Sequence, residues 1–235
     1  MSFPGDLDIV REICTVEFYN NMKAVELMIF DFDGTLVNSG NDLVSSVNYT
    51  LRQLNLPVLP GKTIIGFIGD GVRKLIERSL GKAFPERFEE ALEIFTSYYR
   101  KHLMDTTTIY PGVKDVLNHF RDKKKIILTN KEYSFTVQIT DAFNLTGFFE
   151  EIIGADSRPY LKPDNRLAQP IMEQYDVPPG LALVVGDGIN DVLLAKNAGM
   201  ISCAFLNGLG NREKLLSLQP DFVCESMTEL MELFY

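Results

Sequence analysis

The sequence predicts a doubly wound α/β fold: a parallel sheet covered by helices on both faces, with an all-helical domain inserted into it. Short apolar runs alternate along the chain with amphipathic stretches of helical period, which is the pattern of strand–helix–strand units. The runs are continuously apolar, as expected of strands buried on both faces of a sheet. Three of them end abruptly in polar clusters, at the edge where such folds bind ligands.

The expected strands are the β-prone apolar runs, each bounded by polar residues or glycine. They span residues 25–30, 125–128, 181–185, 201–205 and 222–224. Amphipathic stretches predict the helices that connect these strands and close the core. The expected helices span residues 112–123, 132–144, 166–175, 189–198 and 226–234.

One interval, residues 39–108, breaks the alternation. Apolar residues at three- and four-residue spacing predict helices there, with glycine and proline marking the turns and no strand pattern between them. These helices span residues 42–54, 72–80 and 85–104. We expect residues 39–108 to be an all-helical domain inserted into a core of residues 22–38 and 109–235. We expect residues 1–21 to be an N-terminal extension, from an alternative start or as an added surface helix.

Composition limits the classes of function. The net charge of −9 argues against broad nucleic-acid binding, which needs a basic face. No apolar run approaches the roughly 20 residues that span a bilayer, and the first six residues lack the pattern of a secretory signal. The three cysteines, Cys14, Cys203 and Cys224, are expected to be reduced. We expect a cytoplasmic monomer or homodimer, with neither nucleic acid nor membrane as a partner.

The histidines exclude two further classes. His102 and His119 lie in expected helices, with no cysteine or carboxylate at metal-ligand spacing, so a zinc site is disfavoured. A Ser-His-Asp hydrolase is disfavoured because the chain has no Gly-x-Ser-x-Gly motif. If the protein is an enzyme, its chemistry is expected to use carboxylates and lysine.

The first polar cluster is Asp31-Phe32-Asp33-Gly34-Thr35, directly after the first expected strand. A solvated turn is the simplest interpretation. A calcium loop is disfavoured, because Leu36 stands where such a loop has glycine and the preceding residues are strand-like. Two neighbouring carboxylates in a closing site repel each other strongly unless a cation is present. The pair alone is weak evidence, but the whole string Asp31-Phe32-Asp33-Gly34-Thr35 after an apolar strand indicates a functional site.

The second cluster, Gly186-Asp187-Gly188-Ile189-Asn190-Asp191, follows another expected strand. By itself it is typical of a glycine-rich turn with an N-capping aspartate. With Asp31 and Asp33, however, Asp187 and Asp191 bring four carboxylates toward one edge of the sheet. A hard divalent cation would offset their repulsion, and oxygen ligands completed by water and substrate phosphate suit Mg²⁺.

Two smaller clusters complete the set. Lys162-Pro163 lies in a loop before an expected helix, and Thr129-Asn130-Lys131 follows a strand. A surface lysine and a helix cap are the commoner roles for such residues. An anionic substrate nevertheless needs a local cation in so acidic a chain, and Lys162 is the best-placed lysine among the loops. Thr129 and Asn130 could hold phosphate oxygens at a helix N-terminus.

In this order the four clusters resemble the motifs of the haloacid dehalogenase (HAD) superfamily of phosphohydrolases, from Val25 to the C-terminus. The inserted helices resemble the type 1 cap of that superfamily. The segments 66–73 and 129–131 are most similar to phosphoglycolate phosphatases. The resemblance implies a Rossmann-like HAD core and a Mg²⁺-dependent phosphatase acting on a small phosphorylated metabolite, 2-phosphoglycolate.

The resemblance also implies a mechanism. Asp31 would attack phosphorus and form an aspartyl-phosphate, and Asp33 would act as the general acid and base. Mg²⁺ would be held by the Asp31 carboxylate, the Asp33 backbone carbonyl and Asp187. Asp191 would act through water or by orienting Lys162. The residues expected to bind phosphoryl oxygens are Lys162, Thr129, Asn130 and Gly34.

The helical cap is expected to close over the site and contact the rest of the substrate. The expected contacts are Gly69, Asp70, Gly71 and Arg73. Arg73 and Lys74 could meet a substrate carboxylate, although a solvated helix face explains them equally well.

Other functions compete with this one. A sugar phosphatase or a β-phosphoglucomutase-like phosphomutase shares all four motifs and is the nearest alternative. Dehalogenases lack an aspartate at the position of Asp33. A non-catalytic binding module would have no need to keep the charged residues of all the motifs.

Overall fold

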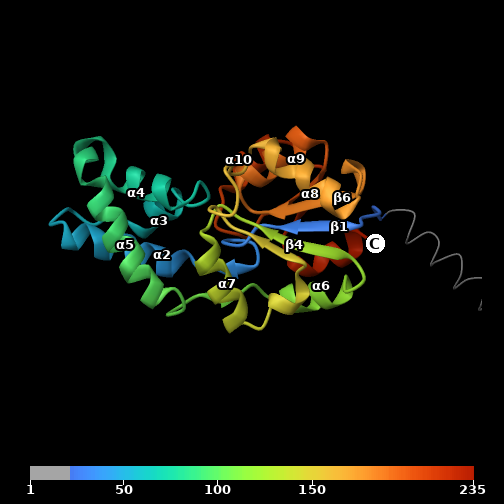
Figure 1. Ribbon diagram of the computed structural model, residues 1–235, viewed down its shortest axis with the longest axis horizontal. Coiled ribbons are helices and arrows are strands. Elements are labelled where there is room, and N and C mark those ends of the chain that lie inside the picture. Colours follow the sequence, from blue (N-terminus) through green and yellow to red (C-terminus); the bar gives the residue numbers. More distant parts are fainter. Residues whose placement is uncertain (1–21) are drawn as a thin grey trace, which may run out of the picture.

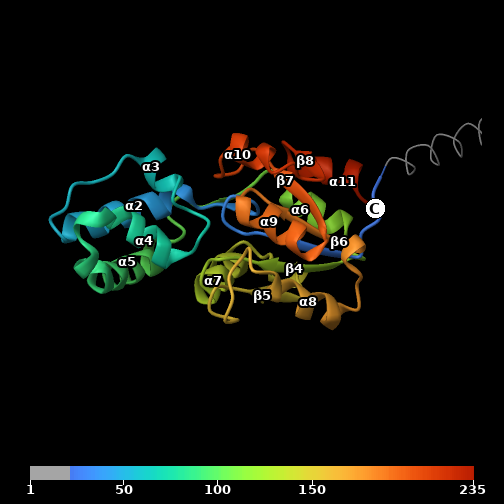
Figure 2. The ribbon, with the colours of Figure 1, turned by 90° about the horizontal axis from the view of Figure 1, so that it is seen from above.

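The computed structural model describes residues 22–235, so the extension expected at residues 1–21 lies outside the described residues. One sheet is built from Leu27–Phe30 (β1), Lys124–Leu128 (β4), Glu151–Ile153 (β5), Ala182–Gly186 (β6), Ile201–Phe205 (β7) and Phe222–Cys224 (β8). These six strands are parallel, in the order β5-β4-β1-β6-β7-β8. Helices cover both faces of the sheet (Figures 1 and 2), which confirms the expected doubly wound α/β fold.

The strand order turns at β1, in the middle of the sheet. On one side Leu27 of β1 lies opposite Lys124 of β4, and on the other side it lies opposite Ala182 of β6. A reversal of this kind leaves a crevice at the carboxyl ends of the central strands. The polar clusters that follow β1, β4 and β6 are therefore brought to the same crevice.

The core helices span Val113–His119 (α6), Tyr133–Ala142 (α7), Ala168–Tyr175 (α8), Ile189–Ala198 (α9), Arg212–Ser217 (α10) and Leu230–Leu233 (α11). Leu27 and Ile29 of β1 belong to the apolar layer that contains residues of α8 and α9. Met28 and Phe30 belong to the layer that contains residues of α6 and α11. Both faces of β1 are thus buried, which explains its unbroken apolar sequence. None of the described helices is both long and apolar enough to cross a membrane.

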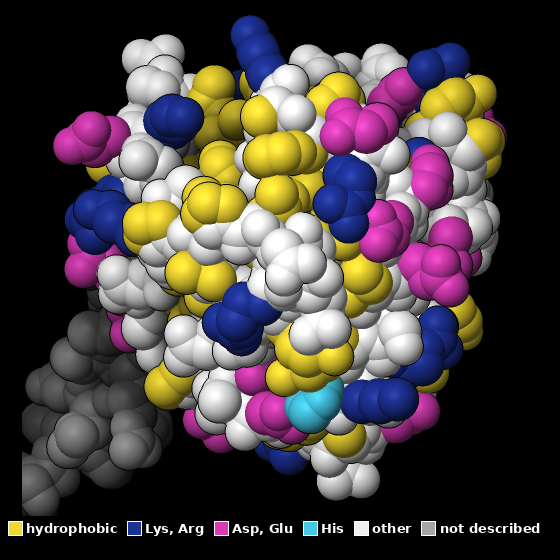
Figure 3. All heavy atoms as spheres, turned by 90° about the vertical axis from the view of Figure 1, so that its left-hand side faces the viewer, with side chains coloured by type: hydrophobic (Ala, Val, Ile, Leu, Met, Phe, Trp, Pro, Cys, Tyr) yellow, Lys and Arg dark blue, Asp and Glu magenta, His cyan; other side chains and the backbone are white. Residues whose placement is uncertain are grey.

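The cap consists of Gly40–Gln53 (α2), Gly61–Ile65 (α3), Val72–Leu80 (α4) and Phe88–His102 (α5). It stands beyond the carboxyl ends of the strands, at the left of Figure 1. Helices α2 and α5 pack together through buried residues spaced four apart, such as Leu43 and Val47 on α2 and Phe95 and Tyr99 on α5. On the outer face of the cap, acidic, basic and hydrophobic side chains are intermingled (Figure 3). The inserted all-helical cap is thus confirmed.

The chain passes twice between core and cap, and the two passages are joined. Val37–Asn38 (β2) and Thr108–Ile109 (β3) form a two-stranded antiparallel ribbon. Beside it, the buried carboxylate of Asp42 in α2 accepts hydrogen bonds from the backbone N–H groups of Thr106 and Thr107 and from both threonine hydroxyls. The start and the end of the cap are therefore held together at one point.

Most expected elements agree with the structure to within a few residues, but five short helices and strands were missed. Helix α3 is flanked by Pro60 and Gly66, which we interpreted only as turn residues. Strand β5 has three residues and begins with a charged one, so it gives no clear apolar run. The ribbon and the six-residue helix α10 are likewise too short for periodicity to reveal them.

Candidate functional site

Asp31 and Asp33 lie in a tight turn at the carboxyl end of β1. The backbone N–H groups of Leu36 and Val37 both donate to the carbonyl of Phe32, which closes the turn. Gly34 adopts a φ of +93°, and a Cβ atom there would lie 2.1 Å from Asp187 Oδ2. The glycine is therefore required both by the backbone conformation and by the close approach of the second motif.

Asp187 and Asp191 are positioned by the connection from β6 to α9. Asp187 accepts hydrogen bonds from the Thr35 hydroxyl (3.0 Å) and from the backbone N–H groups of Leu209 (2.7 Å) and Gly210 (2.9 Å). Asp191 accepts one from the Gly188 N–H at 3.0 Å. Both side chains are almost fully buried, so their carboxylates are fixed in direction.

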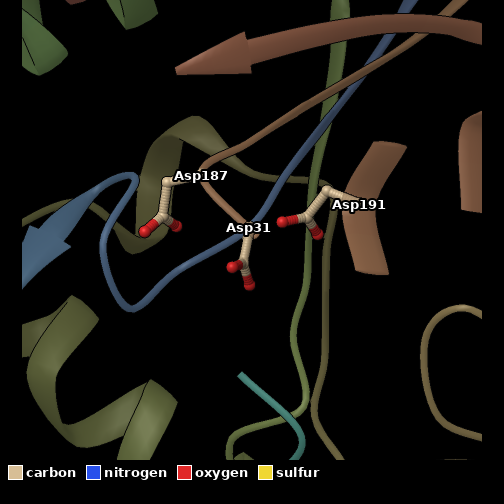
Figure 4. A group of neighbouring side chains, drawn as sticks. All are labelled: Asp31, Asp187 and Asp191. Atoms are coloured by element: carbon tan, nitrogen blue, oxygen red, sulfur yellow. The ribbon is translucent and has the colours of Figure 1, made fainter. Parts of the chain in front are cut away.

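Three carboxylates converge at this point. Oxygen atoms of Asp31, Asp187 and Asp191 all lie within 4.8 Å of one another. Figure 4 shows the three side chains pointing toward a common space. Asp33 is expected to hold the metal through its backbone carbonyl, which this group of carboxylates does not test.

The three carboxylates are short of positive charge. Burial, with the charges of Asp31 and Asp191, raises the pKa of Asp187 to about 8. Burial and the charge of Asp31 raise the pKa of Asp191 to about 6, although Lys162 opposes the shift. A divalent cation would favour the ionised carboxylates, and an all-oxygen donor set fits Mg²⁺. The residues present therefore fit the expected metal.

Within residues 22–235, Lys162 supplies the one ammonium group that contacts this cluster. Its Nζ lies 2.7 Å from Asp31 Oδ1 and 2.6 Å from Asp191 Oδ1. Burial alone would lower the pKa of Lys162, but the carboxylates of Asp191 and Asp31 outweigh it and raise the pKa, so the ammonium stays charged. The structure thus brings Lys162 to the carboxylates, as the sequence predicts.

Asp33 has a cation of its own. Both of its oxygens accept from Lys131 Nζ at 3.0 Å, and the Ser39 hydroxyl donates to Oδ1. Lys131 also donates to the Tyr99 hydroxyl on cap helix α5, at 2.6 Å. The two aspartates of the first motif therefore have separate lysines, Lys162 for Asp31 and Lys131 for Asp33.

The residues of the Thr129-Asn130-Lys131 segment have different partners. Thr129 lines the pocket in front of Asp31, and its hydroxyl accepts a hydrogen bond from the Lys131 N–H. The Asn130 amide is engaged elsewhere: it donates to the carbonyls of Gly69 and Lys162 and accepts from the Lys162 N–H. Asn130 thus fixes the Lys162 loop, and its side chain is not free for the phosphate contact that we expected.

The cap loop approaches the core at Gly69 and Asp70. The Asn190 amide donates to the Gly69 carbonyl (3.1 Å) and to Asp70 Oδ1 (2.6 Å). Asp70 is also paired with Arg78 of the cap. Three of the four cap residues expected at the site, Gly69, Asp70 and Gly71, therefore lie against the core loops.

The fourth expected cap residue, Arg73, does not reach the carboxylates. Its guanidinium is paired with Glu89 at 3.0 Å and stacks on the Phe88 ring, and its side chain is 65% exposed. It lines an outer groove between cap and core rather than the pocket at Asp31. Its solvated position agrees with the alternative interpretation of a surface helix face.

A small pocket, with a cavity volume of about 60 Å³, lies between cap and core in front of Asp31 and Asp33. Its floor carries Thr129, Asn130 and Lys131. The cap supplies a mostly apolar wall, made of Leu43, Ile68, Val72, Leu75, Phe95 and Tyr99. A small substrate with a polar end at the aspartates fits such a pocket.

Residues 28–205 match the family model of the haloacid dehalogenase-like hydrolases. The chain belongs to this family. Along most of its length this haloacid dehalogenase-like hydrolase also resembles proteins named phosphoglycolate phosphatase. The one from Vibrio cholerae is 30% identical over 220 residues, covering 90% of this chain and 97% of the relative. The one from Chromobacterium violaceum is 32% identical over 220 residues, covering 91% and 98%.

Solved structures agree. The crystal structure of a predicted phosphoglycolate phosphatase from Haemophilus somnus superimposes with a TM-score of 0.84 at 27% identity, covering 88% of this chain and 97% of that one. These matches confirm the expected superfamily and enzyme class, a phosphatase-like hydrolase that resembles phosphoglycolate phosphatases.

Sequence reasoning gave no role to three residues of this hydrolase that contact the site. Lys131 was noticed only as the end of Thr129-Asn130-Lys131, and Asn190 only as part of the Asp187 cluster. Tyr99 lies in the middle of a cap helix, where its spacing indicates a core position. Their partners are 32 to 121 residues away in the chain, so no local pattern could reveal them.

Proposed function

We propose that the protein is a Mg²⁺-dependent phosphomonoester hydrolase that works through an aspartyl-phosphate on Asp31. The observation that carries this proposal is the setting of Asp31. Its carboxylate lies at the mouth of the pocket and is bound to the buried ammonium of Lys162. Two further buried carboxylates, Asp187 and Asp191, stand beside it. A nucleophile, a fixed cation and a set of metal ligands are thus together.

In the first step an Asp31 oxygen forms a bond to phosphorus while the bond from phosphorus to the ester oxygen breaks. Asp33 donates a proton to the departing oxygen, so the leaving group departs as an alcohol. In the second step water attacks phosphorus, Asp33 takes a proton from it, and Asp31 is released with inorganic phosphate.

Fixed groups hold the phosphoryl oxygens during both steps. Lys162 stabilises charge on them, and the Thr129 hydroxyl and the Gly34 N–H are further donors in this proposal. Asp31 and Asp187 would hold Mg²⁺, together with the Asp33 backbone carbonyl, and Asp191 fixes Lys162. The bound metal supplies charge neutralisation on the phosphoryl group. The cap limits access of water to the pocket.

We propose 2-phosphoglycolate as the substrate. Relatives that carry the name phosphoglycolate phosphatase match the chain over about nine-tenths of its length. The pocket supports a short leaving group, because apolar cap residues such as Leu75 and Phe95 face the aspartates.

The test is hydrolysis of a panel of phosphomonoesters, with Mg²⁺ or with a chelator, by the wild type and by Asp31→Asn. The panel contains 2-phosphoglycolate, a hexose 1-phosphate and a chromogenic ester. We expect Mg²⁺-dependent release of phosphate, highest kcat/KM for 2-phosphoglycolate, and at least a thousandfold loss in the variant. Equal rates in both proteins would refute the mechanism. Conversion of the hexose 1-phosphate to an isomer, without release of phosphate, would make the protein a phosphomutase.

A further inference from the structure

Lys131 is a buried cation that the catalytic steps above do not use. Its side chain is 5% exposed, and its three donors are directed to the two oxygens of Asp33 and to the Tyr99 hydroxyl. Its Nζ also lies 4.7 Å from the centre of the Tyr99 ring. A buried ion pair is weak evidence for a role in stability, because desolvation offsets the attraction between the charges.

Lys131 lines the pocket on the side of Asp33. Asp33 is the residue proposed to contact the ester oxygen of the leaving group, so Lys131 lies beside the leaving group. Lys162, in contrast, lies beside Asp31, where phosphorus binds. Among the described residues that line this pocket, Lys131 is the one with a positive charge. The cap lines the pocket with apolar residues such as Leu75 and Phe95, and Glu132 lines it from the core.

The basic residues of the cap near this site are turned to other partners. Arg73 is paired with Glu89, Lys74 with Glu77 and Arg78 with Asp70. The guanidinium of Arg100 lies over the Phe135 ring. An anionic group on the substrate would therefore meet Lys131 rather than a cap arginine.

We infer that Lys131, held in place by Tyr99 of the cap, binds a carboxylate on the leaving group and selects phosphomonoesters that carry one close to the ester oxygen. This inference rests on the proposed function and deepens it. In such a substrate, a single carbon atom lies between the ester oxygen and the carboxylate. Both groups can then be reached at once, because Lys131 Nζ is only 3.0 Å from the oxygens of Asp33. One N–H donor of Lys131 turns from Asp33 to the substrate carboxylate, while Tyr99 retains another.

Tyr99 makes this arrangement depend on the cap. Its ring is packed between Phe95 and Phe135, at centroid distances of 5.4 and 5.2 Å. The hydroxyl is therefore fixed, and it directs the ammonium toward Asp33 rather than out to solvent. Burial raises the pKa of Tyr99 to about 12, so the neutral hydroxyl is the form that meets Lys131.

The experiment compares two substrates that differ in the carboxylate: 2-phosphoglycolate and 2-hydroxyethyl phosphate. For each protein the ratio of their kcat/KM values is measured, so that any effect of Lys131 on Asp33 itself affects both substrates and cancels. We expect Lys131→Met to lower the ratio about 100-fold, since a charge-assisted hydrogen bond to the substrate is lost. Tyr99→Phe should lower it about tenfold. Lys101→Met, which removes an exposed charge from the same cap helix, should leave the ratio unchanged.

Two outcomes would overturn the inference. The first is an equal loss for both substrates in Lys131→Met, which would make Lys131 a positioning residue for Asp33 alone. The second is a wild type that does not prefer 2-phosphoglycolate to 2-hydroxyethyl phosphate. In that case hydrolysis of 2-hydroxyethyl phosphate would still support the proposed phosphatase activity.

A binding measurement keeps the inference testable if turnover is absent. Calorimetry on Asp31→Asn, with and without Lys131→Met, gives the dissociation constants of both esters. Tighter binding of 2-phosphoglycolate that disappears with Lys131→Met supports the inference. Equal binding of the two esters to Asp31→Asn refutes it. Failure of the proposed hydrolysis is seen separately, as absence of phosphate release by the wild type.

Discussion

Replacement of Asp42 by alanine should loosen the joint between cap and core. The Asp42 carboxylate is 2% exposed and accepts hydrogen bonds from two backbone N–H groups and two hydroxyls of Thr106 and Thr107. It connects the first turn of α2 with the segment that enters β3. In Asp42→Ala these donors lose their acceptor, and those of Thr107 are buried away from water.

The magnitude follows from the buried part of this network. A hydrogen bond to a charged group contributes about 1.5–3 kcal/mol, and two buried donors of Thr107 lose one each. Thr106 is exposed, so water can replace the acceptor there. We therefore expect Asp42→Ala to lower the free energy of unfolding by at least about 3 kcal/mol, which is the lower end of the range for two such bonds. For a chain of this size, that corresponds to a fall in Tm of roughly 6–12 °C.

Urea denaturation followed by circular dichroism measures this difference, with Asp105→Ala as the control. Asp105 is close in sequence to the two threonines, but its carboxylate is exposed and is paired with His102 on the surface. Its replacement should change the free energy of unfolding by less than about 0.5 kcal/mol. If Asp42→Ala were as stable as the wild type, or Asp105→Ala equally damaged, the role assigned to the Asp42 network would be wrong.

Three further predictions concern the site. Asn190→Asp places a second carboxylate beside Asp70 and should lower kcat/KM about tenfold or more. Adding Asp70→Asn restores a donor–acceptor pair and should recover part of this activity. If the losses of the two single variants simply added in the double variant, the contact would be contradicted. Asp187, with its pKa raised to about 8, binds a proton more readily in the metal-free fold than in the unfolded chain. The metal-free protein should therefore lose stability from pH 6 to pH 8, and the rise in Tm on adding Mg²⁺ should be larger at pH 8; a constant rise across this range would contradict it. Gly34→Ala should displace Asp187 and weaken the binding of Mg²⁺ measured by calorimetry. The control is Gly81→Ala, where φ is +64° but no atom lies within 4 Å of an added Cβ, so only the backbone is strained and Mg²⁺ affinity should be unchanged. Equal Mg²⁺ affinity in both variants would refute the clash with Asp187.

The sequence was sufficient for the sheet and for the carboxylates at its edge. A strand segment buried on both faces is expected to be apolar, so β1 and β6 are visible as unbroken runs and β4 through its residues 126–128. The residue that follows a parallel strand lies at the carboxyl edge whatever else the chain does. The proximity of Asp31 to Asp187 therefore follows from local patterns and the geometry of a sheet alone.

Only the tertiary structure decided which side chains work together. Lys131 and Arg73 are both basic residues beside site motifs, and nothing local distinguishes them. Packing of the cap on the core turns Lys131 into the pocket, against Asp33 and Tyr99, and leaves Arg73 in solvent with Glu89. Contacts of this kind join residues far apart in the chain, and they depend on the angle between two domains and on the space left between them. The periodicity of the sequence carries no information about the space between the two domains. The sequence therefore identifies the polar residues at the carboxyl edge of the sheet, whereas the tertiary structure decides which of them face the pocket.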